Sequence, residues 1–342
     1  MSTIKKIAQK AGVSPTTVAN VLHGNTGKVS PSTRVKVEAI IAEEKYAPNM
    51  GAIILAHSIS RIIGVIMFME PRRNETVLED PFSSAILGAM EKEIRDNNYY
   101  LMLHTTSDED EILRLAKAWK LEGLVLVWVP GDICRIISDN IDTPVVFIDC
   151  YFTDSDRTYY NIGLQDERGG YEIARYLLSM GHRDIVFLAN TPLFPGGDWA
   201  RFNGCRSAFA ERGLALSENR FLSLPKDRQE RERLYGQFVD KSSTYTALVF
   251  SADYYAAEAI SYYQDADIPV PGRISITGYD DNIFARLVRP RLTSVHQNSS
   301  EKGHLAIAML MRLIRKEPIS EADVRLPVRL EIRDSVRQIG DA

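Results

Sequence analysis

Residues 4–22 read IKKIAQKAGVSPTTVANVL, and this stretch decides the fold of the N-terminal part of the chain. Its first apolar residues recur at the spacing of one helix face: Ile4, Ile7, Ala8 and Ala11. Gly12 supplies a turn, and Ser14 with Pro15 suits the cap and first position of a second helix. Two short helices joined in this way form a helix-turn-helix, whose second helix can enter a DNA major groove. The pattern by itself fits an ordinary packed helix pair equally well.

The second helix has an apolar and a polar face. Val18, Val21 and Leu22 are predicted to turn inward, while Thr16, Thr17 and Asn20 face outward near the helix start, where base edges would lie. Ser30-Pro31 repeats the helix start signal and predicts a third helix running to about Tyr46. We expect the three-helix core to be closed from this helix by Val35, Ala39, Ile40 and Ile41.

Length and composition describe a protein of more than one domain. The chain has 342 residues, of which 45% are hydrophobic and 25% charged, as in soluble globular proteins. No apolar run is long enough to span a bilayer, and the basic, polar start is not a signal peptide, so a cytoplasmic location without membrane contact is expected. Cys134, Cys150 and Cys205 lie far apart, which predicts buried thiols and neither a disulfide framework nor a metal site. Nothing in the sequence calls for a cofactor.

Charge is distributed unevenly along the chain. The net charge is −4, but residues 1–60 hold seven Lys and Arg against three Glu, so they carry +4 and the remainder carries −8. This asymmetry suggests a basic head for a polyanion on an acidic body. A solvated helix surface explains the basic residues about as well.

A short apolar segment follows the head. Pro48 ends the preceding unit, Asn49 can cap a new helix, and Gly51 weakens that helix by about 1 kcal/mol relative to alanine. A helix this short is unstable alone. We therefore expect it to become ordered only against a partner chain and DNA.

The head and this segment resemble the lactose/galactose-repressor (LacI/GalR) family of transcription regulators. The resemblance is carried, in order and spacing, by Ala-Gly-Val-Ser at 11–14, Thr-Val-x-x-Val-Leu at 17–22, Val-Ser-x-x-Thr-Arg-x-x-Val at 29–37 and Tyr-x-Pro-Asn at 46–49. It implies DNA contacts from Thr3, Ser14, Thr16, Thr17, Asn20 and His23. It also implies that residues 48–60 form a hinge helix whose Leu55, with Ala52 beside it, wedges into the minor groove at the centre of a palindrome.

The head departs from the family pattern where bases are read. The family usually has Ser-Arg in place of Ala19-Asn20, Asn in place of His23, and Arg in place of Ile53. Asn can pair with adenine through two hydrogen bonds, whereas Arg favours guanine. The sequence therefore predicts an operator that differs from the common family half-site near the Asn20 contact.

Beyond residue 61, apolar runs alternate with amphipathic segments. The expected strands are 62–68, 99–105, 124–129, 145–149, 184–189, 247–251 and 274–278. The expected helices include 82–97, 168–180, 202–212 and 254–264. This alternation predicts an α/β body of two lobes, each a doubly wound parallel sheet, with ligands bound at the carboxyl ends of the strands. Two such lobes can close on a ligand between them.

An enzyme is the first alternative to a binding protein. No Gly-x-Gly-x-x-Gly follows the first strand, and no phosphate-binding Lys-Ser/Thr loop occurs. Asp280 and Asp281 are adjacent and would point apart, while His182 after Gly181 fits a helix end. The sequence thus offers no nucleophile with a base and an orienting group, and we expect no enzyme activity.

The resemblance extends over the body. It rests on Asp80-Pro81-Phe82, Gly181-His182-Arg183-Asp184-Ile185, Arg201-x-x-Gly204, Gly278-Tyr279-Asp280-Asp281, Leu292-Thr293-Ser294-Val295 and Arg333-Asp334-Ser335. It implies a fold like that of periplasmic sugar-binding proteins. The expected organisation is a helix-turn-helix head (1–47), the hinge (48–60) and an effector-binding and dimerisation core (61–342), with an N-lobe of about 61–160 and 294–326 and a C-lobe of about 161–293 and 327–342.

The resemblance implies six effector-binding residues in the cleft: Phe82, Asp149, Arg201, Asp253, Asp280 and Gln297. Arg201 would bind hydroxyls or a carboxylate, Asp149 and Asp280 would accept from a polyol, and Phe82 would stack on a ring. Each has an ordinary structural alternative, namely a lobe salt bridge, a helix cap, a turn or a core position. Ala252-Asp253 and Gln165-Asp166 depart from the family's Asn-Asp and Asp-Asn, so a familiar effector pattern is altered here.

The expectation is therefore a homodimeric regulator on the nucleoid, more a repressor than an activator. It would bind a near-palindromic double-stranded operator and be switched by a small, carbohydrate-related effector between its lobes. Arg72-Arg73 near the cleft mouth fit an anionic ligand or a solvated surface pair. The main alternative keeps the DNA-binding head but makes the core a docking surface for a regulatory protein.

Overall fold

The computed structural model describes residues 3–22, 26–46, 60–69, 77–152, 156–191, 195–240 and 242–340. Several residues singled out above lie outside these ranges: His23, Ala52, Ile53, Leu55, Arg72 and Arg73. The chain divides into two compact units, Met1–Ser60 and Arg61–Ala342, and each is considered by itself.

The first unit is helical. It contains α1 (Ile4–Ala11), α2 (Pro15–Leu22), a 3-10 turn (Thr26–Lys28) and α3 (Pro31–Glu43). The Oγ1 atom of Thr3 accepts from the backbone N of Lys6 at 3.3 Å, and the Oγ atom of Ser14 accepts from that of Thr17 at 3.1 Å. Gly12 ends α1 at φ 70°, a left-handed conformation that favours glycine. The sequence signals at Gly12 and Ser14 thus form the expected turn and cap, and the cap at Thr3 is an addition that was not predicted.

The core of this unit differs from the expectation at α3. Its buried residues are Ile7, Ala8, Ala11, Val18, Val21 and Val37. Val37 is 0% exposed, whereas Val35 is 66% exposed and Ala39 is exposed, so the prediction for those two residues was wrong. The inward face of α3 runs through Val37, Ile40 and Ile41 at spacings of three and four. Val35 lies two positions before Val37, on the opposite side of the helix.

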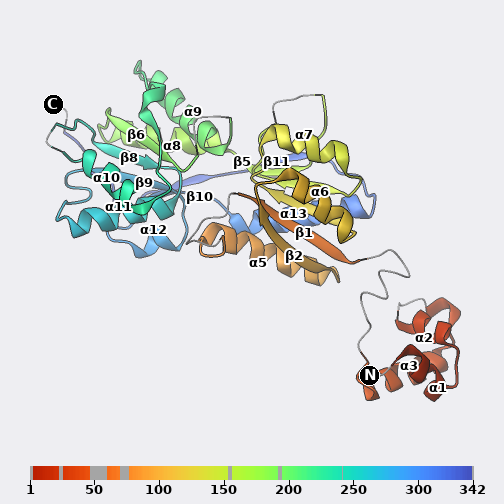
Figure 1. The fold of residues 1–342 in the computed structure, drawn as a ribbon. Coiled ribbons are helices and arrows are strands. Elements are labelled where there is room, and N and C mark those ends of the chain that lie inside the picture. Colours follow the sequence, from red (N-terminus) through yellow and green to blue (C-terminus); the bar gives the residue numbers. More distant parts are fainter. Residues whose placement is uncertain are drawn as a thin grey trace. The chain divides into compact units, whose positions relative to one another are not determined.

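The first sheet of the second unit is entirely parallel, in the order β11-β5-β4-β3-β1-β2 (Figure 1). Its strands are β1 (Ile62–Phe68), β2 (Tyr100–Thr106), β3 (Gly123–Val127), β4 (Val145–Ile148), β5 (Asn161–Leu164) and β11 (Asp323–Leu326). One face is covered by α5 (Pro81–Asp96) and α13 (Ser299–Ile314), the other by α6 (Glu109–Ala118) and α7 (Gly131–Asn140). Both faces are therefore apolar, as parallel strands require.

The second sheet has the order β12-β10-β9-β8-β6-β7 and is parallel except for β12, which pairs antiparallel with β10 (Figure 1). Its strands are β6 (Ile185–Ala189), β7 (Phe221–Ser223), β8 (Ala247–Phe250), β9 (Ser275–Asp280), β10 (Thr293–His296) and β12 (Arg329–Glu331). One face is covered by α8 (Asp166–Ser179) and α9 (Gly197–Ala210), the other by α10 (Arg228–Gln237), α11 (Asp253–Asp265) and α12 (Ile283–Leu287).

The seven expected strands are all present, with ends within two residues of the expectation. β5, β7, β10, β11 and β12 were not expected as strands, because runs of three or four residues carry too little periodicity. Two of them move the expected lobe boundaries: β5 belongs to the first sheet, so that lobe extends to Leu164, and β10 belongs to the second sheet up to His296. The chain thus passes between the lobes after β5, after β10 and between β11 and β12.

The structure also bears on the cysteines and on membrane-spanning helices. Cys134, Cys150 and Cys205 are free and buried, as expected. In the part of the chain that the structure describes, no helix has the length and apolar character needed to cross a bilayer.

Candidate functional site

Five of the six residues expected at the cleft lie where strands end or where helices begin near the lobe junction. Asp149 follows β4, Asp280 ends β9 and Gln297 follows β10. Phe82 is in the first turn of α5, and Arg201 is on α9. Asp149 and Asp280 have φ of 54° and 112°, so both sit in turns that leave the sheet. Ligand sites in such folds form at this carboxyl edge.

A buried lysine that the sequence analysis missed joins three of these positions. Lys302, in the first turn of α13, is 0% exposed. Its Nζ atom donates to Asp149 Oδ1 and Oδ2 at 2.8 and 2.7 Å and to Gln297 Oε1 at 3.0 Å. Gln297 Nε2 in turn donates to Asp280 Oδ1 at 2.5 Å. A continuous polar chain therefore runs from Asp149 of the first lobe to Asp280 of the second.

An aromatic pair borders this lysine. The ring centroid of Phe82 lies 4.9 Å from Lys302 Nζ, within the range of a cation–π contact. Phe82 stacks on Trp128, which follows β3, with ring centroids 5.7 Å apart. The expected aromatic residue is thus 7% exposed and packs within the first lobe, beside the polar chain.

Arg201 is the centre of a second network. Its Nε atom donates to Asp166 Oδ1 at 2.7 Å, its Nη1 donates to the carbonyl of Ser251 at 2.8 Å, and its guanidinium lies 3.7 Å from the ring centroid of Tyr279. Asp166 also accepts from the hydroxyl of Tyr151, a residue of the first lobe. This network too connects the lobes, through Tyr151 and Asp166.

Close helix packing positions Arg201 against Asp166. Gly170 of α8 faces the backbone of Arg201, and a Cβ atom at Gly170 would lie 1.7 Å from the Arg201 carbonyl oxygen. Gly204 makes the reciprocal approach, because its Cβ would lie 1.9 Å from the Glu167 carbonyl oxygen. Only glycine at these two places lets α8 and α9 approach closely enough for the Arg201–Asp166 pair.

Asp253, the sixth residue expected at the cleft, belongs to neither network and is hydrogen-bonded within the second lobe. It is 0% exposed, and both of its oxygens have partners inside the second lobe. Ser294 Oγ donates to Oδ1 at 2.6 Å and the backbone N of Asn282 donates to Oδ2 at 2.8 Å. Asp253 therefore fixes the turn after β9 that carries Asp280.

Burial perturbs the acids of the site. Loss of solvent raises the pKa of Asp149 and of Asp198, and raises that of Asp253 strongly. Burial raises the pKa of Asp280 to about 7; the Arg201 charge counteracts this, and the Asp80 carboxylate adds to it. Burial opposes the charge of Arg201, but Asp166 and its other anionic neighbours outweigh it and keep the Arg201 pKa well above its usual range.

The Asp280→Asn variant should become progressively more stable than the natural protein as pH rises. The folded-state pKa of Asp280 lies above its unfolded value. The natural protein therefore loses stability as pH rises from about 4 to about 7, and it does not regain that stability at higher pH. Asparagine keeps an acceptor for Gln297 and does not ionise. We expect an advantage on the order of 1–2 kcal/mol at pH 8 that shrinks toward pH 5. Calorimetric melting at both pH values checks this, with exposed Asp265→Asn as the control; a pH-independent difference would contradict it.

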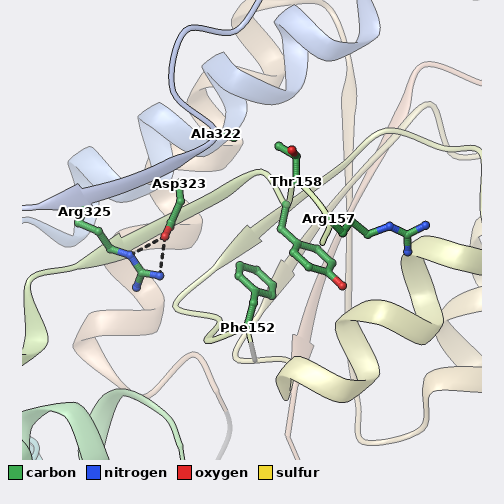
Figure 2. A pocket seen from close by; sticks show the side chains of 7 residues that line it. Phe152, Arg157, Thr158, Ala322, Asp323 and Arg325 are labelled. Carbon is green, nitrogen blue, oxygen red and sulfur yellow. Dashed lines mark hydrogen bonds and ion pairs between the residues drawn. The ribbon is translucent and has the colours of Figure 1, made fainter. Parts of the chain in front are cut away.

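A hollow of about 300 Å³ opens beside the second network (Figure 2). It is lined by Phe152, Arg157, Thr158, Tyr159, Ala322, Asp323 and Arg325. Figure 2 shows Arg325 paired with Asp323, at 2.8 Å between Nη2 and Oδ2. The Arg325 guanidinium also lies 5.2 Å from the ring centroid of Tyr151. The hollow therefore adjoins the inter-lobe network without containing any of the six expected residues.

Of the residues expected to contact DNA, those that the structure describes lie before α1 (Thr3) and just before or along α2 (Ser14, Thr16, Thr17 and Asn20). Thr3 and Ser14 are exposed and cap α1 and α2, and Thr16 is exposed. Thr17 and Asn20 are half-buried, and the hydroxyl of Thr17 lies 2.9 Å from that of Ser14. Lys6 and Lys10 of α1 pair with Glu44 after α3, so part of the basic charge stabilises the head itself. Lys5, Lys28 and Lys36 are exposed.

Comparison with known proteins decides the family. Residues 3–49 match the family described as bacterial regulatory proteins, lacI family, and residues 174–336 match a periplasmic binding protein-like domain. The chain belongs to the LacI family of bacterial regulatory proteins. It is therefore a DNA-binding transcriptional regulator, and the resemblance found in the sequence is confirmed for both head and body.

The chain matches named relatives over nearly its whole length. It is 29% identical to the HTH-type transcriptional repressor PurR of Proteus mirabilis, over 98% of this chain and 97% of that protein. It is 28% identical to the ribose operon repressor of Haemophilus influenzae, over 98% and 99%. These relatives are transcriptional repressors, which agrees with the expected lack of enzyme activity.

Solved structures show the same fold. The lac repressor dimer bound to operator and an anti-inducer matches with a TM-score of 0.83 at 23% identity, over 98% of this chain and 99% of that chain. A complex of the regulator CelR with cellobiose matches with a TM-score of 0.72 at 21% identity, over 98% and 100%. A helical head followed by a two-lobed α/β core is thus confirmed as the fold class.

Proposed function

We propose that this LacI-family protein is a repressor whose operator affinity is set by a small effector, a sugar or sugar derivative, bound between the core lobes. The proposal assigns effector contacts to Phe82, Asp149, Arg201, Asp253, Asp280 and Gln297, and adds Asp166. Lys302 has a positioning role, because it holds Asp149 and Gln297 in place. The observation that carries it is the pair of polar networks that cross the lobe junction at the carboxyl ends of the strands. The ribose repressor and the CelR–cellobiose complex among the similar proteins support a carbohydrate-related ligand.

The networks suggest how the switch works. Because each crosses between lobes, a ligand that replaces one of these contacts changes the preferred orientation of the lobes. A change in lobe orientation would alter the hinge pairing expected for residues 48–60, and so the DNA affinity. The coupling is expected to be about 1–3 kcal/mol and must be reciprocal between effector and DNA.

The head would bind one half-site of a near-palindrome, and a second copy would bind the other. Thr3, Ser14, Thr16, Thr17 and Asn20 are the proposed contacts within the described residues. The proposed contacts of His23, Ala52 and Leu55 lie outside them. A protein that binds operators in chromosomal DNA would be located in the cytoplasm, on the nucleoid.

Exposed apolar side chains support a homodimer formed through the core. Tyr100 is 59% exposed and Leu103 is 37% exposed on β2, the edge strand of the first sheet. In the second lobe, Ile283 and Leu287 on α12 are 51% and 68% exposed. Apolar groups on an edge strand and on a short helix of the same core are typical of a surface that a second copy covers.

Asn20→Ala should weaken binding to a selected operator duplex by about 5- to 150-fold, because one paired base contact is worth about 1–3 kcal/mol. A selection from randomised duplexes should recover adenine at the Asn20 position in the natural protein and lose that preference in the variant. Fluorescence anisotropy and light scattering should also show two chains per duplex. Asn219→Ala, on the exposed turn before β7, is the matched control. Recovery of the common family half-site would contradict the base assignment.

Thermal-shift screening against sugars, sugar phosphates, sugar acids and nucleobases tests the effector. A bound ligand raises the melting temperature by mass action and should change the operator affinity in the same preparation. Silence across the whole panel with intact DNA binding would favour a core that senses a partner protein.

A further inference from the structure

The donors of Lys302 are used within the protein. An ammonium group has three N–H donors and accepts nothing. The Lys302 ammonium contacts both oxygens of Asp149 and the Oε1 of Gln297, at 2.7 to 3.0 Å. Because the Lys302 side chain is 0% exposed, its ammonium group has no N–H left for a ligand that enters from solvent. A ligand that needs a cationic donor at this place would have to break a buried ion pair, which is costly.

The acceptors around it are not all used. Among the described residues, the two networks contain four carboxylates (Asp149, Asp166, Asp198 and Asp280) and two cations (Lys302 and Arg201). Lys302 pairs with Asp149, and Arg201 with Asp166. Asp280 Oδ1 accepts from Gln297, and among the described residues none is recorded as donating to its Oδ2. The site therefore has spare acceptor capacity and an excess of negative charge.

The groups that contact the Lys302 ammonium show which kind of ligand this part of the site suits. The Lys302 ammonium is itself held by a carboxylate, by an amide oxygen and by the ring face of Phe82. A carboxylate, a neutral acceptor and an aromatic face together make an environment suited to an ammonium ion. One ammonium is already tethered here, next to the unsatisfied oxygen of Asp280.

We propose that the effector site selects a ligand that carries a positive charge, an amine-bearing polyol whose ammonium pairs with Asp280, and that Lys302 is the specificity-determining residue. Lys302 withholds Asp149 and Gln297 from the hydroxyls of a neutral sugar and competes with the ligand's ammonium for them. This inference rests on the proposed function, because it concerns the effector of the same site.

Anionic and neutral ligands fit the site less well. A carboxylate or phosphate would lie among four carboxylates, and among the residues of these networks that the structure describes Arg201 is the cationic donor outside the Lys302 pair. A neutral polyol would satisfy the free oxygen of Asp280 but would gain nothing from the excess negative charge. Hydrogen bonds between charged groups are roughly twice as strong as neutral ones, which favours the amine.

The pairing also sets a pH dependence. The groups that face Asp280 are Arg201 on α9, Asp253 on α11, Asp80 before α5, and Gln297 and Lys302 at α13. Burial raises the Asp280 pKa to about 7, so the carboxylate is partly protonated near neutral pH. An ammonium needs the ionised form, so the affinity should rise between pH 6 and pH 8 and fall again when the ligand's own amine loses its proton.

The test compares sugars that differ only in charge. Glucosamine, glucose and glucuronate form one series, and galactosamine, galactose and galacturonate a second, each titrated into the full-length protein by calorimetry. The amine member should bind at least about tenfold more tightly than the neutral one, and the uronate should not bind. Asp280→Asn should reduce the amine's affinity to that of the neutral sugar. Tighter binding of a uronate or a neutral sugar would overturn the inference and leave the proposed function standing.

Lys302→Met should change the affinities of cationic and anionic ligands in opposite directions. It releases Asp149, so an amine ligand should bind several-fold more tightly; a ligand that uses Lys302 as an anion partner would instead be lost. Because Lys302→Met leaves the buried Asp149 unpaired, Lys302→Met with Asp149→Asn is the second variant, and it should retain the amine preference through Asp280. Loss of amine binding in both variants would overturn the inference. No heat or thermal shift from any of the six sugars, with operator binding intact, would overturn the inference; silence across the wider panel of sugars, sugar phosphates, sugar acids and nucleobases would be needed to overturn the small-effector proposal as well.

Discussion

Val37→Ser should abolish operator binding and leave the effector core folded. Val37 is 0% exposed in a head whose described core has six buried residues. Serine removes apolar contact and buries a hydroxyl without an assigned partner, at a cost of about 2–4 kcal/mol. A unit of 60 residues has little stability to lose. Anisotropy with an operator duplex should show more than 100-fold weaker binding, while the melting transition of the core stays in place.

Val35→Ser is the matched control for this prediction. It makes the same chemical change two positions earlier in α3, at a side chain that is 66% exposed. The operator affinity should stay within about threefold of that of the natural protein, because exposed substitutions cost about 0.5 kcal/mol or less. If Val35→Ser were the damaging change and Val37→Ser harmless, α3 would present its other face to the core.

Arg201→Met should remove the response to the effector and destabilise the core. Methionine fills similar volume but leaves the carboxylate of Asp166, which is 3% exposed, without its cation. Breaking a buried ion pair from one side costs about 3–5 kcal/mol. Operator binding by the head should persist, but no effector should change it, and the core should melt at a lower temperature.

The double variant Arg201→Met with Asp166→Asn separates the two roles of Arg201. Neutralising Asp166 removes the uncompensated charge, so most of the lost stability should return, while the effector response should stay absent. Arg206→Met, one turn and a half further along α9 and paired only loosely with Glu218 at 3.8 Å, is the control and should respond normally. A double variant that still responds would show that Arg201 serves stability alone.

The expectations from the sequence succeeded where the signal is local. The caps at Ser14 and Ser30 and the turn at Gly12 are determined within four residues, and all three form as expected. Thr3 also caps α1, which was not predicted. The prediction of which side of α3 faces the core was wrong for Val35. Apolar residues lie on several sides of this helix, so Val35 and Val37 both fit a core position. Which of them is inward depends on where α1 and α2 pack, which no local pattern states.

Lys302 shows the same limit in the candidate site. It lies four residues before the buried Ala306 and eight before Leu310, so its position on the inward face of α13 could be predicted from the sequence. A buried lysine requires a partner, and that partner, Asp149, is 153 residues away in the sequence. Asp253 shows the same dependence on distant residues, because its two oxygens accept from Ser294 Oγ and from the backbone N of Asn282, 41 and 29 residues away in the sequence.

The sequence by itself determined the helix-turn-helix, the alternation of strands and helices and the basic head on an acidic body, because periodicity, capping and composition act over a few residues or over the whole chain. The family followed from the resemblance of its motifs. Only the tertiary structure decided which charges meet. The pairing of Lys302 with Asp149, of Gln297 with Asp280 and of Tyr151 with Asp166 follows from the order of strands in two sheets and from three passages of the chain between lobes. Those contacts depend on distances through space, which the spacing of residues along a chain does not contain.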